Sequence, residues 1–175
     1  GLFLQIRPGT DAALALAMIH VIIQEGLFDR GFVENYTTGF AQLKSHVADF
    51  TPERAAEICD VMAEDIYHIS RIFAGAKSAC IEAGICSLDQ QINGFQTNRA
   101  LAILHTITGN INKPGGWCQN PFMRMPDLRL VHGYKGQMPI GCAPYPIFHG
   151  FWGMTSPYGR QMDLPNAILN ESPYP

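Results

Sequence analysis

Residues 12–24 are the feature of the sequence that most constrains the fold. His20 is the only residue in this stretch that can carry charge, and apolar side chains fall on every side of the helix that the stretch predicts. Such a helix must be covered on most of its faces, so other parts of the chain have to pack around it. Gly26 is predicted to end the helix, because glycine is favoured just after a helix C-terminus.

The residues that precede this helix predict a ligand-facing corner. Residues 2–6 predict a strand, Gly9 supplies a permissive backbone and Thr10 is a good N-cap. Backbone N–H groups at a helix N-terminus favour hydrogen-bond acceptors. Asp11 only accepts hydrogen bonds when ionised, and it favours a partner with paired N–H donors, such as the edge of a guanine. The alternative is that Thr10 and Asp11 merely cap the helix.

A second corner of the same kind is predicted later in the chain. Residues 78–83 predict a strand, residues 84–90 a loop, and residues 93–107 a helix with one apolar face. In open α/β sheets, ligands bind in the crevice beyond the strand ends. The repeated order therefore predicts an α/β fold whose two strand-loop-helix corners face a ligand.

The rest of the chain divides into helical and irregular parts. Thr51 and Pro52 form a strong helix-start signal, because threonine caps a helix and proline fits its first turn. Residues 1–120 are predicted to form the α/β segment, and residues 121–175 an irregular segment of the same domain, rich in proline, glycine and aromatic residues. The further helices are predicted at residues 32–36, 41–48, 52–59, 63–75 and 164–169.

Composition excludes several classes of partner and site. The net charge of −3 and the absence of a run of basic residues argue against a nucleic-acid partner. Five cysteines at these spacings match neither a zinc site nor an iron–sulfur motif, so we expect free, buried thiols. The longest apolar run is too short to cross a bilayer, and no membrane insertion is predicted. The sequence begins almost inside a predicted strand and stops in a turn, so we expect a piece of a longer chain.

Several polar side chains leave two interpretations open. His20 and His105 lie in apolar helices, where hydrogen-bonded core histidines are commoner than ligands. His132 and His149 either line a substrate path or belong to an ordinary surface loop. Cys86 is expected to pack, because no Lys, Arg or His adjoins it to activate the thiol.

Three charged residues are candidates for a buried or ligand-bound role. Arg7 either binds an anion or forms a salt bridge within the fold, and Arg99 has the same two alternatives. Glu82 lies at the end of a predicted buried strand, where a charge requires a partner or a ligand.

The order and spacing of several short motifs resemble the large catalytic subunits of the molybdopterin oxidoreductases, the superfamily of dimethyl sulfoxide reductases and formate dehydrogenases. The resemblance implies a helix-rich part of the Rossmann-like, three-layer αβα central domains of those subunits. The motifs are Arg7 to Leu14, Glu25 to Asp29 with Phe32-Val33, Tyr36 to Phe40, Thr51-Pro52-Glu53, residues 90–100, Thr108 to Ile111, Pro114-Gly115-Gly116 and Pro173-Tyr174-Pro175.

The resemblance also implies which residues bind the cofactor. It places the guanosine end of a molybdopterin guanine dinucleotide at Gly9, Thr10 and Asp11. The second corner would approach the pterin or its pyrophosphate. The resemblance implies three further residues near the pterin-bearing cleft, with the following segment contributing to the substrate funnel. The residues of the second corner are Gly84 and Gln90, and those near the cleft are Asn110, Gly115 and Gly116.

The family's metal-ligand residue and its N-terminal cysteine cluster have no counterpart here, so no catalytic or metal-ligating residue is predicted. The resemblance implies two guanine dinucleotide pterins with molybdenum or tungsten in a full-length parent, and an iron–sulfur cluster in its N-terminal part. This segment alone is expected to be inactive. Implied partners are a small-molecule substrate, the remainder of the catalytic subunit and an iron–sulfur electron-transfer subunit. The compartment stays open.

Two alternatives remain at the level of sequence. The chain is either part of such an oxidoreductase or a stand-alone α/β module that binds a nucleotide or another protein. Within the superfamily, the non-redox hydratase or transhydroxylase branch also fits. As an isolated piece, the chain is expected to expose apolar surface, starting with the helix at residues 12–24, and to self-associate.

Overall fold

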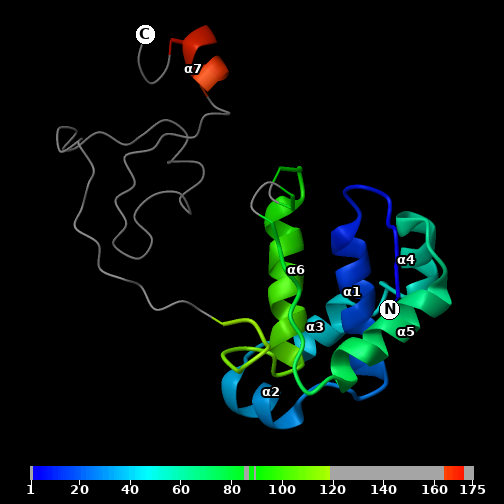
Figure 1. The fold of residues 1–175 in the computed structure, drawn as a ribbon. Helices are drawn as coiled ribbons and strands as arrows, with labels where there is room; N and C mark the ends of the chain where they lie inside the picture. The colour runs from blue at the N-terminus through cyan, green and yellow to red at the C-terminus, as the bar shows by residue number, and fades with distance from the viewer. Residues whose placement is uncertain (1, 85–86, 89, 119–163, 172–175) are drawn as a thin grey trace. The chain divides into compact units, whose positions relative to one another are not determined.

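The computed structural model describes residues 2–84, 87–88, 90–118 and 164–171. The chain divides into two compact units, Gly1–Pro121 and Phe122–Pro175. The helices of the first unit and the single described helix of the second are drawn in Figure 1. They are α1 (Asp11–Gln24), α2 (Arg30–Tyr36), α3 (Phe40–His46), α4 (Pro52–Cys59), α5 (Ala63–Gly75), α6 (Gly94–Ile107) and α7 (Leu164–Leu169).

Helix α1 is the centre of the first unit. It packs against α4, α5 and α6, and apolar residues around its circumference are buried. The expectation of a helix covered on most faces is confirmed. The end of the helix is also as predicted: Gly26 has a φ of +67°, its N–H donates to the Ile23 carbonyl, and the Leu27 N–H donates to the Ile22 carbonyl. These two bonds satisfy carbonyls that the helix itself leaves free.

Helices α1 and α6 run side by side in the same direction. Ala15 and Leu101 belong to one buried cluster, and Ile22 and Ile107, one to two turns further on, belong to the next. The N-termini of both helices therefore lie at the same end of the unit, which Figure 1 shows at the top. This pairing brings the two predicted corners to one end of the first unit.

Two of the short helices, α2 and α4, begin at local side-chain caps. Thr51 accepts a hydrogen bond from the Arg54 N–H at the start of α4, and Asp29 accepts one from the Phe32 N–H at the start of α2. The Asp29 N–H in turn donates to the carbonyl of Ile107, which attaches the start of α2 to the end of α6. Each cap satisfies a first-turn donor that a helix cannot satisfy internally.

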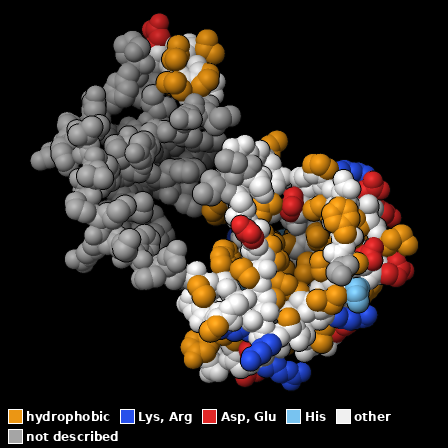
Figure 2. Space-filling model, viewed as in Figure 1, with side chains coloured by type: hydrophobic (Ala, Val, Ile, Leu, Met, Phe, Trp, Pro, Cys, Tyr) orange, Lys and Arg blue, Asp and Glu red, His pale blue; other side chains and the backbone are white. Residues whose placement is uncertain are grey.

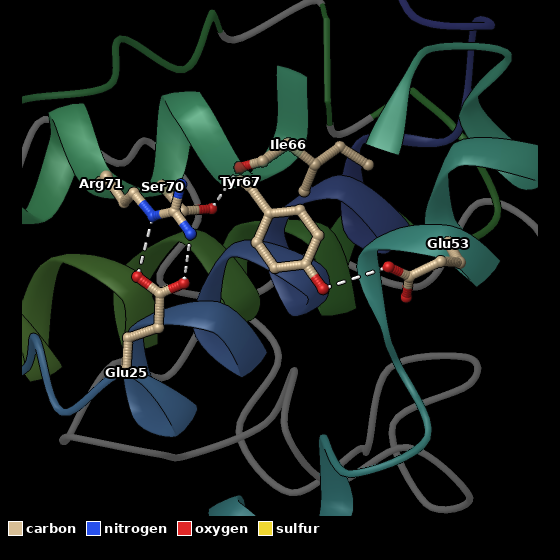
Figure 3. A network of polar contacts seen from close by, with 6 residues as sticks. All are labelled: Glu25, Glu53, Ile66, Tyr67, Ser70 and Arg71. Atoms are coloured by element: carbon tan, nitrogen blue, oxygen red, sulfur yellow. Dashed lines mark hydrogen bonds and ion pairs between the residues drawn. The ribbon is translucent and has the colours of Figure 1, made fainter. Parts of the chain in front are cut away.

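Polar contacts of α5 attach it to both of its neighbours (Figure 3). Arg71 donates two hydrogen bonds, of 2.9 and 2.7 Å, to the carboxylate of Glu25 just after α1. This pairing lowers the pKa of Glu25 and raises that of Arg71. The Tyr67 hydroxyl donates to Glu53 on α4 at 3.1 Å, and burial followed by this bond raises the pKa of Tyr67.

The two predicted strands are not formed in the part of the chain that the structure describes. The Arg7 N–H, after residues 2–6, donates to the Cys59 carbonyl at the end of α4. In residues 78–83, the N–H groups of Ala79 and Ile81 donate to side chains that follow or belong to α6. A strand needs a neighbouring strand for its hydrogen bonds, and here a helix end and side chains take that place. The described residues are therefore helix-rich, with one isolated bridge between Ile111 and Trp117.

Several single-residue expectations are corrected. Glu82 is exposed instead of lying at the end of a buried strand, because the described residues form no sheet around it. Cys59 is buried as expected, but Cys80 and Cys118 are exposed free thiols. Cys86, His132, His149 and residues 121–163 lie outside the described residues. No helix in the described ranges is long and apolar enough to cross a membrane.

Candidate functional site

The first corner is a tight turn that leads directly into α1. The Thr10 N–H donates to the Arg7 carbonyl at 3.2 Å, and Gly9, with a φ of +84°, occupies the turn position that favours glycine. The conformational role predicted for Gly9 is confirmed. Thr10 occupies the N-cap position, but its hydroxyl donates to the Arg7 carbonyl at 2.6 Å and makes no cap bond to α1. The Thr10 hydroxyl is therefore bonded to the Arg7 carbonyl instead of capping α1.

The start of α1 therefore presents both donors and an acceptor. The N–H groups of Asp11 and Ala12 have no acceptor among the described residues, as is usual for the first turn of a helix without a side-chain cap. Asp11 is half-buried and adds a carboxylate to the same turn. Arg7 is exposed, and its guanidinium has no ion-pair partner in the described part of the chain. This end of α1 can thus meet a ligand that carries acceptors and donors together.

Cys59, the last residue of α4, holds the first corner in place through two hydrogen bonds. Its carbonyl accepts the Arg7 N–H at 2.8 Å, and its thiol donates to the Thr10 carbonyl at 3.6 Å. The side chain is buried, and burial raises the pKa of the thiol. A protonated, buried thiol is a structural group and a poor nucleophile. The end of α4 thereby fixes the backbone at both ends of the turn.

The second corner lies before α6. Gly84 and Gln90 are both exposed, whereas Leu88 is buried against Ala15 and anchors the loop to α1. A Cβ at Gly84 would meet Ser87 at 3.5 Å, which is an ordinary contact. Packing within the described residues therefore does not require glycine at position 84.

Gly9 and Gln91 bring the two corners into contact. A Cβ on Gly9 would lie 3.2 Å from Oε1 of Gln91, closer than most real contacts of this kind. Sequence reasoning selected Gln90 and missed Gln91, because no local signal distinguishes the two neighbouring glutamines. The packing of α1 beside α6 decides which of the two glutamines faces the turn at Gly9.

Asn110 is fully engaged by the scaffold. Its Oδ1 accepts the Ala79 N–H at 3.0 Å, its Nδ2 donates to the Thr108 hydroxyl at 2.9 Å, and the side chain is buried. Its backbone N–H donates to the His105 carbonyl, and its carbonyl accepts the Trp117 N–H at 2.7 Å. Asn110 thus joins the end of α6 to residues 78–81 and to the glycine turn that follows.

The two glycines of that turn are required by their neighbours. Gly115 has a φ of +78°, and a Cβ there would lie 2.5 Å from the Ser78 hydroxyl. A Cβ on Gly116 would lie 2.8 Å from the Asn110 carbonyl oxygen. Both positions therefore accept only glycine without a local shift. This requirement arises inside the protein and holds with or without a ligand.

His105 is a hydrogen-bonded core histidine, as predicted, whereas His20 is hydrogen-bonded but only half-buried. The Nδ1 of His20 lies 2.8 Å from the Val47 carbonyl. His105 is buried, its Nδ1 lies 2.7 Å from the Leu101 carbonyl, and its Nε2 accepts the Ile81 N–H at 3.0 Å. Both ring nitrogens of His105 are bonded within the protein, and in the described ranges no three His, Cys, Asp or Glu residues gather where they could hold an ion.

The eight predicted site residues lie in three places. Gly9, Thr10, Asp11 and Gln90 belong to the corners at the N-terminal ends of α1 and α6. Gly84 belongs to the segment that leads into the second corner. Asn110, Gly115 and Gly116 lie beyond the other end of α6, a helix of 14 residues and about 21 Å. The structure brings the first group together and separates it from the last three residues by the length of α6.

Comparison with known proteins identifies relatives over most of the chain. No protein-family model matches it. The F420-dependent formate dehydrogenase subunit alpha of Methanocaldococcus jannaschii is 38% identical over 95% of this chain and 25% of its own length. Formate dehydrogenase H of Escherichia coli is 39% identical over 89% of this chain and 21% of its own length.

A solved structure is also similar. The acetylene hydratase from Pelobacter acetylenicus matches 59% of this chain and 14% of its own, with a TM-score of 0.58 and 42% sequence identity. The chain spans about a quarter or less of each of these three relatives.

Proposed function

This chain belongs to the molybdopterin oxidoreductase superfamily, and we propose that its two adjoining corners hold part of a molybdopterin guanine dinucleotide that carries molybdenum or tungsten. One observation carries the proposal: Gly9 and Gln91 place the start of α1 against the loop that leads into α6. Two helix N-termini at one end of the unit form a favourable setting for a ligand that contains phosphates.

The residues at this end fit such a group chemically. The N–H groups of Asp11 and Ala12 are free to bind phosphate or carbonyl oxygens, and the Asp11 carboxylate can accept from the N–H groups of a guanine edge. Gly9 keeps the backbone accessible where a side chain would press on Gln91. Donors and an acceptor side by side suit a guanine nucleotide better than a free phosphate, which Asp11 would repel.

We assign the guanosine to Gly9, Thr10 and Asp11, and the pyrophosphate or pterin to Gly84 and Gln90. Thr10 acts there through its turn, because its hydroxyl is already bonded to Arg7. The side chain of Gln90 is exposed and has no hydrogen-bond partner among the described residues, so it can donate and accept.

Asn110, Gly115 and Gly116 have a more indirect role in this proposal. They lie at the far end of α6, and both polar groups of the Asn110 side chain are bonded within the protein. We propose that Asn110 positions the backbone that borders the pterin-bearing cleft. The two glycines leave that backbone without side chains, so that the cofactor can approach it closely. An extended dinucleotide cofactor can reach both ends of α6, whereas a mononucleotide cannot.

The activity of the whole protein is proposed from the relatives. When bound, the cofactor supplies the metal and the two-electron redox chemistry, and the polypeptide binds and orients it. The enzyme would act on a small molecule, assemble its three-layer αβα domain from the remainder of the catalytic subunit, and pass electrons through an iron–sulfur subunit. A non-redox hydratase is the second candidate, because the similar solved structure is an acetylene hydratase.

Replacing Asp11 with asparagine tests the guanine assignment. In the enzyme expressed from its full reading frame, Asp11→Asn should lower the guanine nucleotide released per protein about tenfold or more, because a charged hydrogen bond contributes about 1.5–3 kcal/mol. Metal content should fall with it. Asp65→Asn, in the first turn of α5, is the matched control and should change neither quantity. Full guanine and metal content in Asp11→Asn would refute the assignment.

A further inference from the structure

Residues 78–81 are held by side chains instead of by a neighbouring strand. Ala79 and Ile81, two residues apart, donate their N–H groups to Asn110 Oδ1 and His105 Nε2. Alternate residues of an extended segment direct their N–H groups to the same side, so the two acceptors stand where a partner strand would offer its carbonyls. The two bonds form a clamp, defined here as His105 and Asn110 acting on Ala79 and Ile81.

The clamp fixes the chemical state of His105. Because Nε2 accepts a hydrogen bond from the Ile81 N–H, that nitrogen carries no hydrogen of its own. The ring hydrogen must then be on Nδ1, where it points at the Leu101 carbonyl 2.7 Å away. A neutral histidine with its hydrogen on Nδ1 is the state that satisfies both bonds. If Nε2 carried a hydrogen, the Nε2–H of His105 and the backbone N–H of Ile81 would both be donors and could not form this hydrogen bond.

The ring is also fixed by its neighbours. His105 is 1% exposed. The Phe73 ring meets it edge to face, with centroids 5.5 Å apart, and the Trp117 ring lies at 4.9 Å. The imidazole has little freedom to turn away from Ile81, so the position of the Ile81 backbone follows from the position of α6.

We propose that His105 and Asn110 are positioning residues for the cofactor-facing loop, a role that rests on the proposed function. Ile81 precedes Gly84 by three residues, and the loop beyond it contains Leu88, packed against α1, and Gln91, which adjoins Gly9. The clamp fixes where this loop begins, and Leu88 fixes its middle. Loss of the clamp should make the start of the loop, residues 79–84, more mobile while leaving α1 and α6 in place.

Two variants of His105 separate the clamp from simple packing. His105→Phe keeps an aromatic ring between Phe73 and Trp117 but removes the acceptor for Ile81. His105→Gln gives up the ring but offers an amide oxygen as a replacement acceptor. If His105 acts through its hydrogen bond to Ile81, His105→Gln should retain more bound nucleotide than His105→Phe. If His105 acts only through packing of its ring, the order should be reversed.

The experiment measures amide hydrogen exchange and cofactor content in the enzyme expressed from its full reading frame. For His105→Phe we expect exchange over residues 79–84 to accelerate about tenfold, the equivalent of one lost net hydrogen bond, with α1 and α6 still protected. Released guanine nucleotide per protein should also fall. His105→Gln should lie closer to the wild type in both readouts. Unchanged exchange in His105→Phe, or a greater loss in His105→Gln, would overturn the proposal.

A third variant covers the case in which His105→Phe does not fold. Ile81→Pro removes the donor and changes no residue of α6, although it also shortens a side chain that packs against the core, and proline suits an extended segment. It should accelerate exchange at the loop entrance and lower nucleotide content in the same way. Unchanged values for both quantities in a folded Ile81→Pro protein would again overturn the proposal.

Asp11→Asn distinguishes failure of this inference from failure of the proposed function. If Asp11→Asn loses nucleotide and His105→Phe retains it, the positioning role is wrong and the guanine assignment stands. If Asp11→Asn retains nucleotide and His105→Phe loses it, the guanine assignment is wrong and the positioning role stands. Loss of nucleotide in both variants, with faster exchange only in His105→Phe, supports both.

Discussion

Gly115 and Gly26 both adopt positive φ, at +78° and +67°, but their surroundings differ. A Cβ on Gly26 would meet nothing within 4 Å, whereas a Cβ on Gly115 would collide with the Ser78 hydroxyl. The motif around Gly115 predicted a glycine beside a ligand cleft. The contact with Ser78 supplies a sufficient reason for glycine at this position within the protein itself.

Alanine at these two positions should have different costs. Both substitutions force a left-handed backbone, which costs about 1–2 kcal/mol, and Gly115→Ala adds the clash with Ser78. We therefore expect Gly115→Ala to lower the free energy of unfolding clearly more than Gly26→Ala, as measured by urea denaturation.

A double variant tests the cause of that difference. Ser78→Ala removes the hydroxyl and leaves its Cβ 3.3 Å from the added methyl. It should restore much of the stability that Gly115→Ala loses and restore none in the Gly26→Ala background. Equal costs of the two alanines, or no rescue by Ser78→Ala, would contradict the structural explanation.

At the scale of elements, the helices are held together by polar contacts as well as by packing. The pairing of Arg71 with Glu25 joins α5 to the end of α1 (Figure 3), and both side chains are partly exposed. Exposed ion pairs contribute little and are screened by salt. Their effect is best detected through its dependence on pH.

Arg71→Met should remove a pH-dependent part of the stability. Arg71 lowers the pKa of Glu25 below its ordinary value of 4.5, so the folded state favours the ionised carboxyl. The contribution is fully present above pH 4.5 and disappears as the pH falls through the lowered value. The difference in unfolding free energy between wild type and Arg71→Met should therefore shrink below pH 4.5 and at high salt.

Lys44→Met is the control for this measurement. Lys44 is an exposed lysine on α3 with no ion-pair partner among the described residues. Its removal should produce no comparable dependence on pH over the range in which Glu25 is protonated. A constant difference for Arg71→Met across that range would show that the pair does not act between α1 and α5.

At the scale of the whole molecule, the exposed apolar surface is not where the sequence indicated. Helix α1 was expected to contribute exposed apolar surface, but α4, α5 and α6 cover it. Large apolar side chains are exposed elsewhere, and among them Phe3, Ile92 and Phe95 are 84%, 103% and 63% exposed. Figure 2 shows hydrophobic side chains between charged ones on the visible face.

The 175-residue chain on its own should self-associate through such side chains, which static light scattering would detect as a mass above 19.3 kDa. Ile92→Lys combined with Phe95→Lys should lower the apparent mass. Asn93→Lys with Gln96→Lys adds the same charge at exposed polar positions of the same region and should lower it less. A monodisperse monomer of the unaltered chain would contradict this expectation.

Local patterns predicted the helices well. The helix starts after Thr10 and Thr51, the end at Gly26 and the buried character of α1 were all visible in the sequence. Helical hydrogen bonds join residues four apart, and caps join residues about three apart. Such elements are therefore determined by neighbours along the chain, and the conformational role of Gly9 was predictable for the same reason.

The sequence by itself thus determined where helices begin and end, which of them is central, and which motifs resemble those of the superfamily. Only the tertiary structure decided that Gln91 adjoins Gly9, that Ser78 requires Gly115, and that His105 and Asn110 replace a strand as partners of residues 79 and 81. These contacts join residues that are about 24 to 82 positions apart in the chain. The first follows from how α1 packs beside α6 and the others from how residues 78–81 lie along α6 and the turn after it, which no local pattern of residues specifies.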